Sequence, residues 1–480
     1  MAVMQRILVL GYGSVAHCFV PLLIKFFGVP PRLITAIDLQ DKRERVAPGV
    51  QFAQHEITKD NYNSILSKYV QEGDLIIDLG LNIDSVALIT WCASKGVHLL
   101  NSALVSWDSD PAHATNFNAS SIKENLFWKI RNAIKTFSSQ GPTAILTHGA
   151  NPGLSAHFVK KALCDLAVHV LKKRDVPNKQ LIERSLADKQ FAHLAAALAI
   201  NVVHIAEYDG HLINVPKRMN EFVNTWSPSA LMQECIDVCQ IGWGTHEKRL
   251  PKKFFNHPQL PHYVLLPWRS LDMFMYSWVP SGEIIGMIVP HEDIFEFVMQ
   301  LSVYNEKQLE YCPTICYVYR MCDAAILSLQ ELQARRLRPQ DTWRVVTTQE
   351  IVAGSDQLGA VLMGNNGTWW TGSVLDITQV AALLPNQNAC TMQVAAGLAV
   401  GFDYICKNPN KGICMPFDID HEYALKVATP FLGTMISQSV EWSPLALANS
   451  LLSYEQTPFS TNDAWQFNTF LSRGTYGINN

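Results

Sequence analysis

The sequence predicts an α/β protein with a parallel sheet in its N-terminal domain and a second domain of the α+β class. The apolar run that follows Arg6 leads directly into Gly11-x-Gly13-x-x-Ala16 and then into a helix-like stretch. Short apolar runs and amphipathic stretches alternate through the first 150 residues, which is typical of successive βαβ units. After residue 155 the alternation ends, and long helical stretches mix with aromatic-rich, strand-like pieces.

The turn over residues 11–16 has the spacing of a dinucleotide-binding loop in a Rossmann domain. Gly11 would allow the tight turn, Gly13 would let a pyrophosphate approach the backbone, and Ala16 would keep the helix close to the sheet. The phosphates would lie on the first amides of the helix, at Ser14, Val15 and Ala16. The same turn would also fit a Rossmann-like domain that has lost its ligand.

A second apolar run, over residues 33–38, ends in Asp38, at roughly the 20-residue distance where the ribose-binding carboxylate of such domains lies. A carboxylate accepts hydrogen bonds from the ribose hydroxyls and repels a 2′-phosphate. It therefore favours NAD over NADP, although Arg43 nearby would favour the phosphate.

Further strands and helices of the N-terminal domain follow in order. Strands are expected within residues 73–80, 97–101 and 144–149, and helices over 85–95, 116–138 and 156–166. Asn151, next to Pro152, follows the last of these strands. It is either a helix N-cap or, at the carboxyl edge of the sheet, a contact to substrate or nicotinamide.

The second domain is expected to contain two long helices and several strands. The helices are predicted over 192–207 and 229–240, and the strands over 263–267, 286–289, 345–348, 360–363 and 368–374. A helix rich in small residues, 389–405, is expected to return to the Rossmann domain, although a place in the second domain fits nearly as well. We therefore assign 1–153 to the NAD-binding domain, completed by a helix near 389–407, and 154–388 with 408–480 to a substrate and dimerisation domain.

Composition narrows the class of protein. With 480 residues, of which 48% are hydrophobic, the chain can bury a large core in two or three domains. The net charge is -4 and the basic residues form no run, which argues against a nucleic-acid or anionic-membrane partner. The apolar stretches look too short to span a membrane, and the first strand starts too early for a signal peptide, so a cytoplasmic location is expected.

The 11 cysteines are scattered, and the closest pairs have i,i+4 spacing rather than C-x-x-C. We expect reduced, partly buried thiols rather than disulfides or a zinc site, and no metal.

Acidic and aromatic residues recur in apolar surroundings after the Rossmann region. Glu207 would end an alanine-rich helix, Trp226 would stand at a helix N-cap with Glu234 about two turns later, and Asp356 would lie in a glycine-flanked turn. Each residue alone is more often solvated or capping. Together they suggest a pocket for an organic cation. A buried ammonium group needs paired carboxylates, and an aromatic ring adds about 0.5–2 kcal/mol of cation–π attraction. His291, after a strand-like run, is either a proton carrier or a structural histidine.

The chain resembles the bacterial homospermidine synthases, in the saccharopine dehydrogenase-like group, essentially from end to end. The resemblance rests on the glycine turn and on motifs at residues 148–153, 204–207, 224–226, 350–356 and 393–396. It implies synthesis of homospermidine from two putrescine molecules, or related diamines, by a homodimer whose NAD is reduced and reoxidised within one cycle. It also implies that the substrate pocket contains Glu207, Trp226, Glu234, His291, Asn151 and Asp356.

Within this resemblance, Trp226 would clamp the cation, Glu207 would lie near the amine that is oxidised, and Glu234 and Asp356 would hold ammonium groups farther along. The sequence departs from the family over residues 97–107, where Val105 or Ser106 stands in place of a strand-end acid.

The chemistry requires a neutral amine when hydride leaves its carbon, so a buried base such as Glu207 would take the amine proton. One alternative is a net NAD(P)-dependent dehydrogenase of the saccharopine or carboxyspermidine type. Its carboxylate-bearing substrate would need a basic pocket residue, and the motif segments have none at their centres. A second alternative is a non-catalytic protein that senses NAD.

Overall fold

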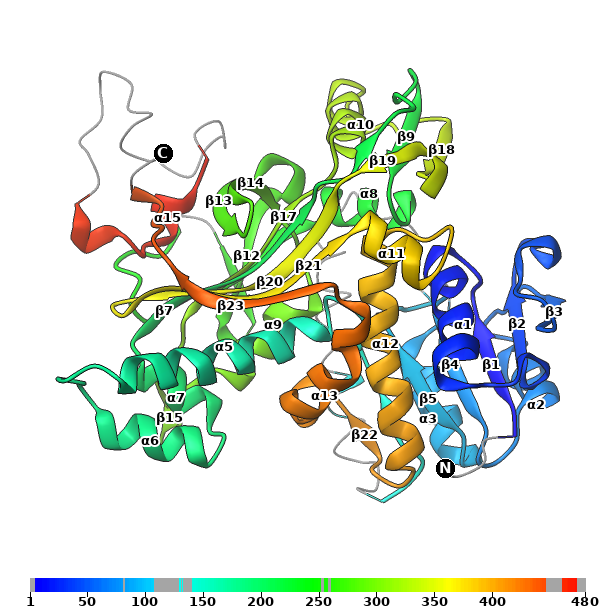
Figure 1. The fold of residues 1–480 in the computed structure, drawn as a ribbon, viewed down its shortest axis with the longest axis horizontal. Helices are drawn as coiled ribbons and strands as arrows, with labels where there is room; N and C mark the ends of the chain where they lie inside the picture. The colour runs from blue at the N-terminus through cyan, green and yellow to red at the C-terminus, as the bar shows by residue number, and fades with distance from the viewer. Residues whose placement is uncertain are drawn as a thin grey trace.

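The computed structural model describes residues 5–80, 83–107, 129–130, 132, 140–251, 254–257, 260–445 and 460–472. Two large sheets dominate the structure (Figure 1). The first has seven parallel strands in the order β22-β6-β5-β4-β1-β2-β3. These are β1 (Ile7–Leu10), β2 (Ile34–Asp38), β3 (Gln51–Gln54), β4 (Leu75–Asp78), β5 (His98–Asn101), β6 (Ala144–Ile145) and β22 (Ile413–Cys414).

The strand order reverses at β1, which makes a doubly wound sheet and confirms the predicted Rossmann-like domain. Its helices are α1 (Ser14–Phe27), α2 (Tyr62–Tyr69) and α3 (Ser85–Lys95). Helix α1 begins directly after Gly13 and ends at Gly28, whose φ of 66° is the left-handed conformation that glycine tolerates at a helix C-terminus. The predicted helix over 116–138 lies almost wholly outside the described residues.

The second sheet has ten strands and confirms an α+β second domain. Its main path is β11-β12-β10-β17-β7-β20-β21-β23, and the hairpin β13-β14 joins it at β17. The strands are β7 (Ile200–Asp209), β10 (Val238–Gly242), β11 (Phe255–His257), β12 (Leu260–Arg269), β13 (Phe274–Val279), β14 (Gly282–Ile288), β17 (Thr314–Arg320), β20 (Ser355–Gly364), β21 (Gly367–Asp376) and β23 (Thr434–Val440).

The remaining elements surround this sheet. The helices are α5 (Leu154–Leu171), α6 (Lys179–Ala187), α7 (Phe191–Ala197), α8 (Pro228–Ile236), α9 (Glu292–Gln300), α10 (Asp323–Ala334), α11 (Ile377–Leu383), α12 (Ala389–Lys407), α13 (His421–Ala428) and α15 (Phe467–Phe470). Three further two-stranded sheets pair β8 (Leu212–Ile213) with β19 (Ile351–Ala353), β9 (Glu221–Asn224) with β18 (Thr342–Val345), and β15 (Val303–Asn305) with β16 (Gln308–Tyr311).

Three sequence predictions were wrong in the second domain. The helix expected over 192–207 ends at Ala197, and the chain then enters strand β7, because pairing with β17 and β20 outweighs the helix preference of the alanines. The helix expected over 229–240 ends at Ile236, before β10. The strand expected over 345–348 is β18, which ends at Val345 and pairs with β9 outside the large sheet.

The small-residue helix is confirmed as α12, and it packs against α1. A Cβ atom on Gly397 would lie 1.9 Å from the carbonyl oxygen of Gly149, so only glycine permits this approach. By length and composition α12 would suffice to cross a membrane, contrary to the sequence expectation. However, 78% of its apolar window is buried inside the structure, so α12 is a core helix.

The large sheet has two different faces. Ile205, Tyr317 and Leu358 belong to one continuous core with the N-terminal domain, whereas Val318 and Val361 lie in a separate core on the opposite face. Because side chains alternate along a strand, every second residue of β7, β17 and β20 is directed toward the N-terminal domain. That shared face carries the candidate site.

Candidate functional site

Glu207 lies on β7, on the face that meets the N-terminal domain, and only 7% of it is exposed. The Nδ2 atom of Asn151 donates a hydrogen bond of 2.6 Å to Glu207 Oε2, and the Tyr317 hydroxyl donates to the same oxygen. Burial raises the pKa of Glu207 to about 7, although these two donors oppose the shift. At neutral pH this carboxyl group can therefore either accept or release a proton.

Asp356 supplies a second buried carboxyl group. It lies on strand β20 opposite Asp209 of β7, and not in a turn as expected, because the chain turns at Gly354, just before the strand. Neither of its carboxyl oxygens has a well-formed hydrogen bond from the described residues. Burial raises the pKa of Asp356 well above its usual value, and the charges of Glu207 and Asp209 raise it further.

Trp226 follows strand β9 and precedes α8. The N-cap of α8 is Ser227 rather than Trp226, because the Ser227 hydroxyl accepts the hydrogen bond from the Ala230 amide at 3.3 Å. The indole Nε1 instead donates to the Tyr319 hydroxyl at 3.1 Å, which holds the half-buried ring beside the shared face. Glu234 lies on α8, half-buried, and its charge contributes to raising the pKa of Tyr317.

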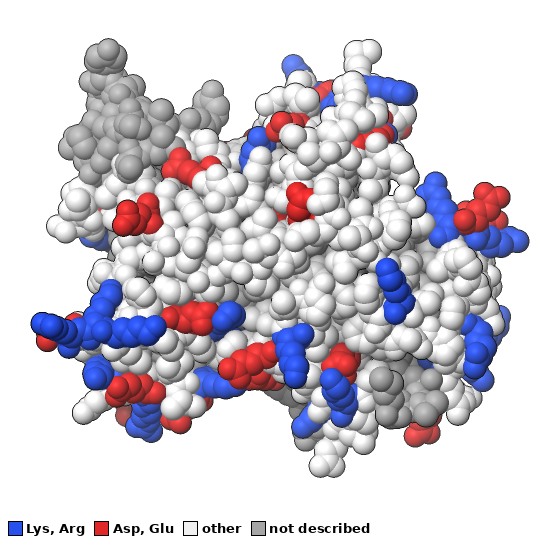
Figure 2. Space-filling view, viewed as in Figure 1, with Lys and Arg blue, Asp and Glu red and all other residues white. Residues whose placement is uncertain are grey.

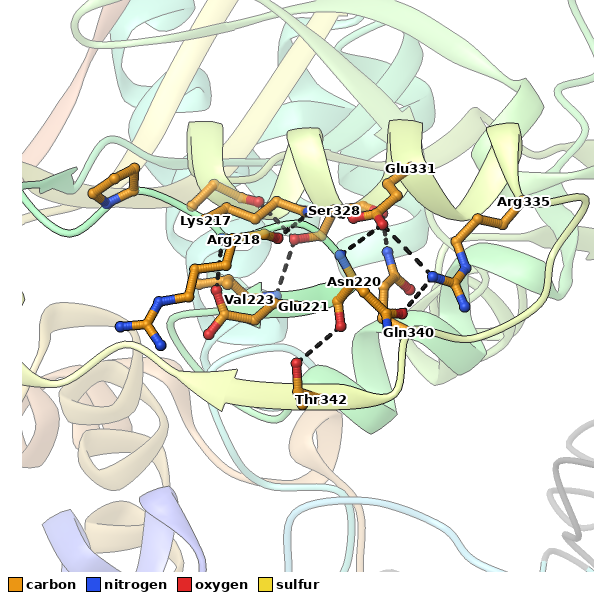
Figure 3. Close-up of polar contacts among 12 residues, drawn as sticks. Lys217, Arg218, Asn220, Glu221, Val223, Ser328, Glu331, Arg335, Gln340 and Thr342 are labelled. Carbon is orange, nitrogen blue, oxygen red and sulfur yellow. Dashed lines mark hydrogen bonds and ion pairs between the residues drawn. The ribbon is translucent and has the colours of Figure 1, made fainter.

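A polar network holds β9, the strand that leads to Trp226 (Figure 3). Glu331 of α10 accepts a hydrogen bond of 2.8 Å from the Asn220 amide and pairs with Lys217. The Ser328 hydroxyl accepts a hydrogen bond of 2.9 Å from the amide of Val223. These contacts fix β9 on α10 and thereby fix the start of the segment that carries the tryptophan.

His291 is the N-cap residue of α9. Its ring meets the Tyr317 ring edge to face, with ring centres 5.1 Å apart. Its Nδ1 lies 3.7 Å from the carboxyl group of Asp293, which accepts a hydrogen bond of 2.9 Å from Ser155. The histidine is therefore in contact with the tyrosine that binds Glu207.

The structure gathers the six predicted pocket residues around one face of the large sheet. The half-buried residues are Asn151, Trp226 and Glu234, and the buried residues are Glu207, His291 and Asp356. In the described part of the chain, no lysine or arginine forms an ion pair with Glu207 or Asp356. Acidic groups without a basic partner, beside an indole, can accommodate an organic cation.

Asp209 was not predicted from the sequence as a site residue. It lies two residues beyond Glu207 on the same face of β7. Its carboxylate binds the ring Nδ1 of His211 at 2.6 Å and the Thr225 hydroxyl at 2.6 Å. Burial opposes ionisation, but His211 and these hydrogen bonds keep the pKa of Asp209 below its usual value. The spacing that marks Asp209 is visible only once the segment is read as a strand.

Asp209, His211 and Cys390 lie close enough together to suggest a metal centre. However, His211 Nδ1 contacts Asp209 and its Nε2 accepts a hydrogen bond of 3.4 Å from the Ala389 amide. Both ring nitrogens are therefore engaged, and the group forms a hydrogen-bonded link between β7 and the start of α12.

The residues proposed for cofactor binding lie at the carboxyl ends of β1 and β2. Gly11 has a φ of 81°, and a Cβ on Gly13 would meet nothing within 4 Å, so the turn is open to a ligand. Asp38 accepts hydrogen bonds from the Tyr12 and Gln40 amides at 2.8 and 2.9 Å. Lys42 also contacts Asp38, at 3.0 Å.

Burial opposes the charge of Asp38, but the two amides and Lys42 lower its pKa, so it remains a carboxylate. Arg43, which the sequence placed near the ribose, instead pairs with the exposed Asp41 at 3.1 Å. This arrangement fits an adenosine ribose at Asp38 and a pyrophosphate at the start of α1.

Comparison with known proteins places the chain in a family. The saccharopine dehydrogenase NADP binding domain matches residues 7–145, and the saccharopine dehydrogenase C-terminal domain matches residues 149–440. Homospermidine synthase of Blastochloris viridis is 30% identical, with 97% of each chain covered. The chain belongs to the homospermidine synthase family. The homologue of Mesorhizobium japonicum is 29% identical, with 97% of this chain and 96% of that protein covered.

A solved member of the homospermidine synthase family shares the whole architecture. The enzyme of Legionella pneumophila, in complex with NAD, superimposes with a TM-score of 0.87 at 31% identity, covering 98% of this chain and 99% of that one. Apo saccharopine dehydrogenase of Saccharomyces cerevisiae, at 10% identity and a TM-score of 0.50, shares the fold alone. The predicted fold class and the family resemblance are thus confirmed.

The segment that departs from the family pattern is described as far as residue 107. Val105 and Ser106 are each 9% exposed, and the Val105 amide donates to the Ser85 hydroxyl at 2.8 Å. Neither residue supplies a carboxylate, so acidity in the described site comes from β7, β20 and α8.

Proposed function

We propose that this protein joins two putrescine molecules into homospermidine with release of ammonia, through imine intermediates and with NAD as an internal hydride carrier. The observation that carries the proposal is the pair of buried carboxyl groups, Glu207 and Asp356, neither of which has a basic partner among the described residues. The indole of Trp226 bonds to Tyr319, the residue opposite Glu207. Homology to homospermidine synthases over nearly the whole chain supports it.

A diammonium substrate supplies the charges that this pocket lacks. Both carboxyl groups have raised pKa values, and a bound ammonium would favour their charged forms. The indole face of Trp226 would add cation–π attraction. A saccharopine-type substrate carries carboxylates, which these acidic groups would repel, so the pocket favours a diamine over the substrates of the net dehydrogenases.

Five of the six pocket residues have a role in this reaction. When bound, the nicotinamide supplies the hydride acceptor that later returns the hydride to the second imine. Glu207 would take the proton of the ammonium group before oxidation, while Asn151 orients its carboxyl group. Asp356 and Glu234 would hold distal ammonium groups, and the aromatic walls from β17 and Trp226 would exclude the water that hydrolyses imines.

NAD would bind along the Rossmann crevice. Gly11, Gly13 and the first amides of α1 would hold the pyrophosphate, and Asp38 would accept the ribose hydroxyls. Asn151, in contact with Glu207, lies after β6, where the crevice meets the large sheet. We further propose a cytoplasmic location, which suits the eleven free thiols of the chain.

We also propose that the protein is a homodimer joined through β23. This strand forms an edge of the large sheet and pairs only with β21 among the described strands. None of its residues is charged, and Figure 2 shows few charged side chains across the central area that β23 crosses in Figure 1. An uncharged open edge is suited to strand pairing, and a second copy offers the same edge about a two-fold axis.

The interface is tested by placing charges on the edge. Lysines at the exposed positions Gln438 and Ser439 should convert a dimer into a monomer by repulsion across the axis, as measured by light scattering after gel filtration. Lysines at the exposed Asn305 and Gln308, on β15 and β16, form the matched control. A wild-type monomer, or a dimer that survives the edge lysines, would contradict the interface.

The proposed activity is tested with putrescine and catalytic NAD, following reduced cofactor by absorbance and polyamines and ammonia by mass analysis. Homospermidine and ammonia beyond one turnover per NAD, without accumulation of NADH, would support the synthase. Stoichiometric NADH with an aldehyde would identify a net dehydrogenase instead. NAD binding without any product would favour a sensor.

A further inference from the structure

Two tyrosines of β17 face the site, although neither was predicted from the sequence. Tyr317 and Tyr319 are separated by one residue, so they share a face of the strand, and both are buried. Their rings stack with centres 6.1 Å apart and planes 12° apart. Strand β17 runs parallel to β7, and Tyr319 lies directly opposite Glu207.

The hydroxyl groups of the two tyrosines have different partners. The Tyr319 hydroxyl accepts a hydrogen bond from the Trp226 indole. The Tyr317 hydroxyl donates to Glu207 Oε2, the oxygen that also accepts from Asn151. Both donors thus bond to the same oxygen of Glu207. The other oxygen, Oε1, accepts no hydrogen bond from the described residues.

We propose that Tyr317 is a positioning residue, which anchors Oε2 of Glu207 so that Oε1 is presented to the substrate amine as the proton acceptor. The inference rests on the proposed function, in which Glu207 takes the amine proton. A hydrogen bond donated to a carboxylate favours its charged form, so Tyr317 also keeps Glu207 available as a base despite its burial. Asn151 holds the same oxygen from the opposite domain.

The surroundings keep Tyr317 in its donor form. Burial raises the pKa of Tyr317 well above its usual value, and the neighbouring Glu207 raises it further, so the phenol stays protonated over the working range. The titratable groups around Tyr317 and Glu207 come from five elements and from the residue that precedes helix α9. They are Asp209 of β7, Tyr319 of β17, Asp356 of β20, Glu234 of α8, and His291 and Cys390 beside α9 and in α12.

The test is the pH profile of kcat/KM in Tyr317→Phe, which removes the donor and keeps the ring. Loss of the hydrogen bond raises the pKa of Glu207. The acidic limb of the profile, over which kcat/KM rises as Glu207 loses its proton, should therefore move to higher pH by about one unit. Replacing Tyr317 with 3-fluorotyrosine strengthens the donor, and the limb should then move to lower pH. The opposite signs separate a tuned carboxyl group from a general loss of structure.

Two phenylalanine variants serve as controls. Tyr263 is buried and donates to Gln240 at 2.6 Å on another part of the sheet, so Tyr263→Phe should leave the profile unchanged. Tyr319→Phe removes the acceptor of Trp226, so KM for putrescine should rise while the acidic limb stays in place.

A readout without turnover separates this inference from the proposed function. Infrared titration of the NAD-loaded protein should show a carboxyl band that is absent in Glu207→Gln, and its midpoint should rise in Tyr317→Phe. If wild type makes no homospermidine but this midpoint moves, the proposed function fails, while the anchoring of Glu207 by Tyr317 stands. If homospermidine is made but neither the midpoint nor the limb moves in Tyr317→Phe, the inference is overturned.

Discussion

Two acidic clusters of this protein have opposite electrostatics. Around the small sheet of β9 and β18, Glu221 of β9 pairs with Arg344 of β18 at 2.8 Å, and Glu331 of α10 pairs with Lys217. The pKa values of both glutamates lie below the usual range. Burial would raise the pKa of Glu221, but hydrogen bonds donated by Arg344 and by the Arg218 amide lower it more. The main cause for Glu331 is the hydrogen bond donated by Lys217. On the shared face of the large sheet, burial raises the pKa values of Glu207 and Asp356.

The difference lies in the partners and not in the acids. The first cluster contains its own cations, so it is complete in the free protein. In the second, neither Glu207 nor Asp356 has a basic partner among the described residues, and a buried carboxylate without a cation is costly. Such a cost indicates a binding function, since the missing charge can be supplied by a ligand. Five predictions test this contrast.

The largest effect is expected for Glu207→Gln, which removes the proton acceptor while preserving shape. Its kcat/KM for putrescine should fall by roughly 10²–10⁴-fold, the usual contribution of a general base. Glu331→Gln, in the paired cluster, is the matched control. Its amide oxygen can still accept the hydrogen bond from the Asn220 amide that holds β9, so its kcat/KM should stay close to wild type. Steady-state kinetics of homospermidine formation measures kcat/KM for both variants. Equal losses of kcat/KM would contradict the difference between the two acidic clusters.

Asp356→Asn should impair binding of the second charge of the substrate. A hydrogen bond to a charged group contributes about 1.5–3 kcal/mol, so KM for putrescine should rise by roughly 10–100-fold. Inhibition by butylamine, which has one ammonium group, should change much less. A similar loss for both amines would show that Asp356 does not hold the distal ammonium.

Trp226→Ala should raise KM for putrescine by roughly 2–30-fold, which corresponds to about 0.5–2 kcal/mol of cation–π attraction. Trp226→Phe keeps an aromatic face but loses the bond to Tyr319, so it should lie between wild type and the alanine variant. If the phenylalanine variant is as impaired as alanine, the indole hydrogen bond matters more than the ring face.

Glu207→Gln should also stabilise the protein, and the gain should depend on pH. The folded pKa of Glu207 is about 7, above the unfolded value near 4.5, so the folded state binds the extra proton. Wild-type stability therefore falls as pH rises from about 4.5 through 7, by on the order of 3 kcal/mol from this group. Thermal unfolding of the two proteins should differ most at pH 8 and converge below pH 4.5; a constant difference would contradict the raised pKa.

The smallest effect is expected for the stability of Glu331→Gln. The side chains of Glu331 and Lys217 are 21% and 8% exposed. Because glutamine can still accept hydrogen bonds there, the loss should be about 0.5–1.5 kcal/mol. The melting temperature should fall by a few degrees at most. The fall should shrink in high salt, because salt weakens the attraction between the two charges. A large, salt-independent loss would mean that Glu331 contributes to stability by more than its charge pair with Lys217.

The N-terminal domain was predictable because its signals are local. The strand before Gly11, the glycine turn and the apolar run ending at Asp38 each follow from a few neighbouring residues. The parallel direction of the strands follows from the βαβ pattern. The last strand, β22, lies in the range that we assigned to the second domain, and its place in this sheet was not predicted. The small-residue helix α12 was likewise visible in the sequence, although its contact with Gly149 was not.

The site was predictable only in part. Its six residues came from motifs and family resemblance, but Glu207 was assigned to a helix because alanines precede it. That error concealed Asp209, since an i,i+2 relation matters only in a strand. Tyr317 escaped notice for a different reason: its contact with Glu207 depends on the register of β17 against β7, more than 100 residues away in sequence.

The most direct test of the central claim, that the unpaired carboxyl groups await a diammonium ligand, is calorimetry of putrescine binding to the NADH-loaded protein. With reduced cofactor the substrate cannot be oxidised, and buffers of different ionisation enthalpy reveal protons released on binding. At pH 6 the account predicts proton release by wild type, less release by Glu207→Gln, and a difference between them that shrinks above pH 7. Binding without proton release, or with equal release by both proteins, would contradict it.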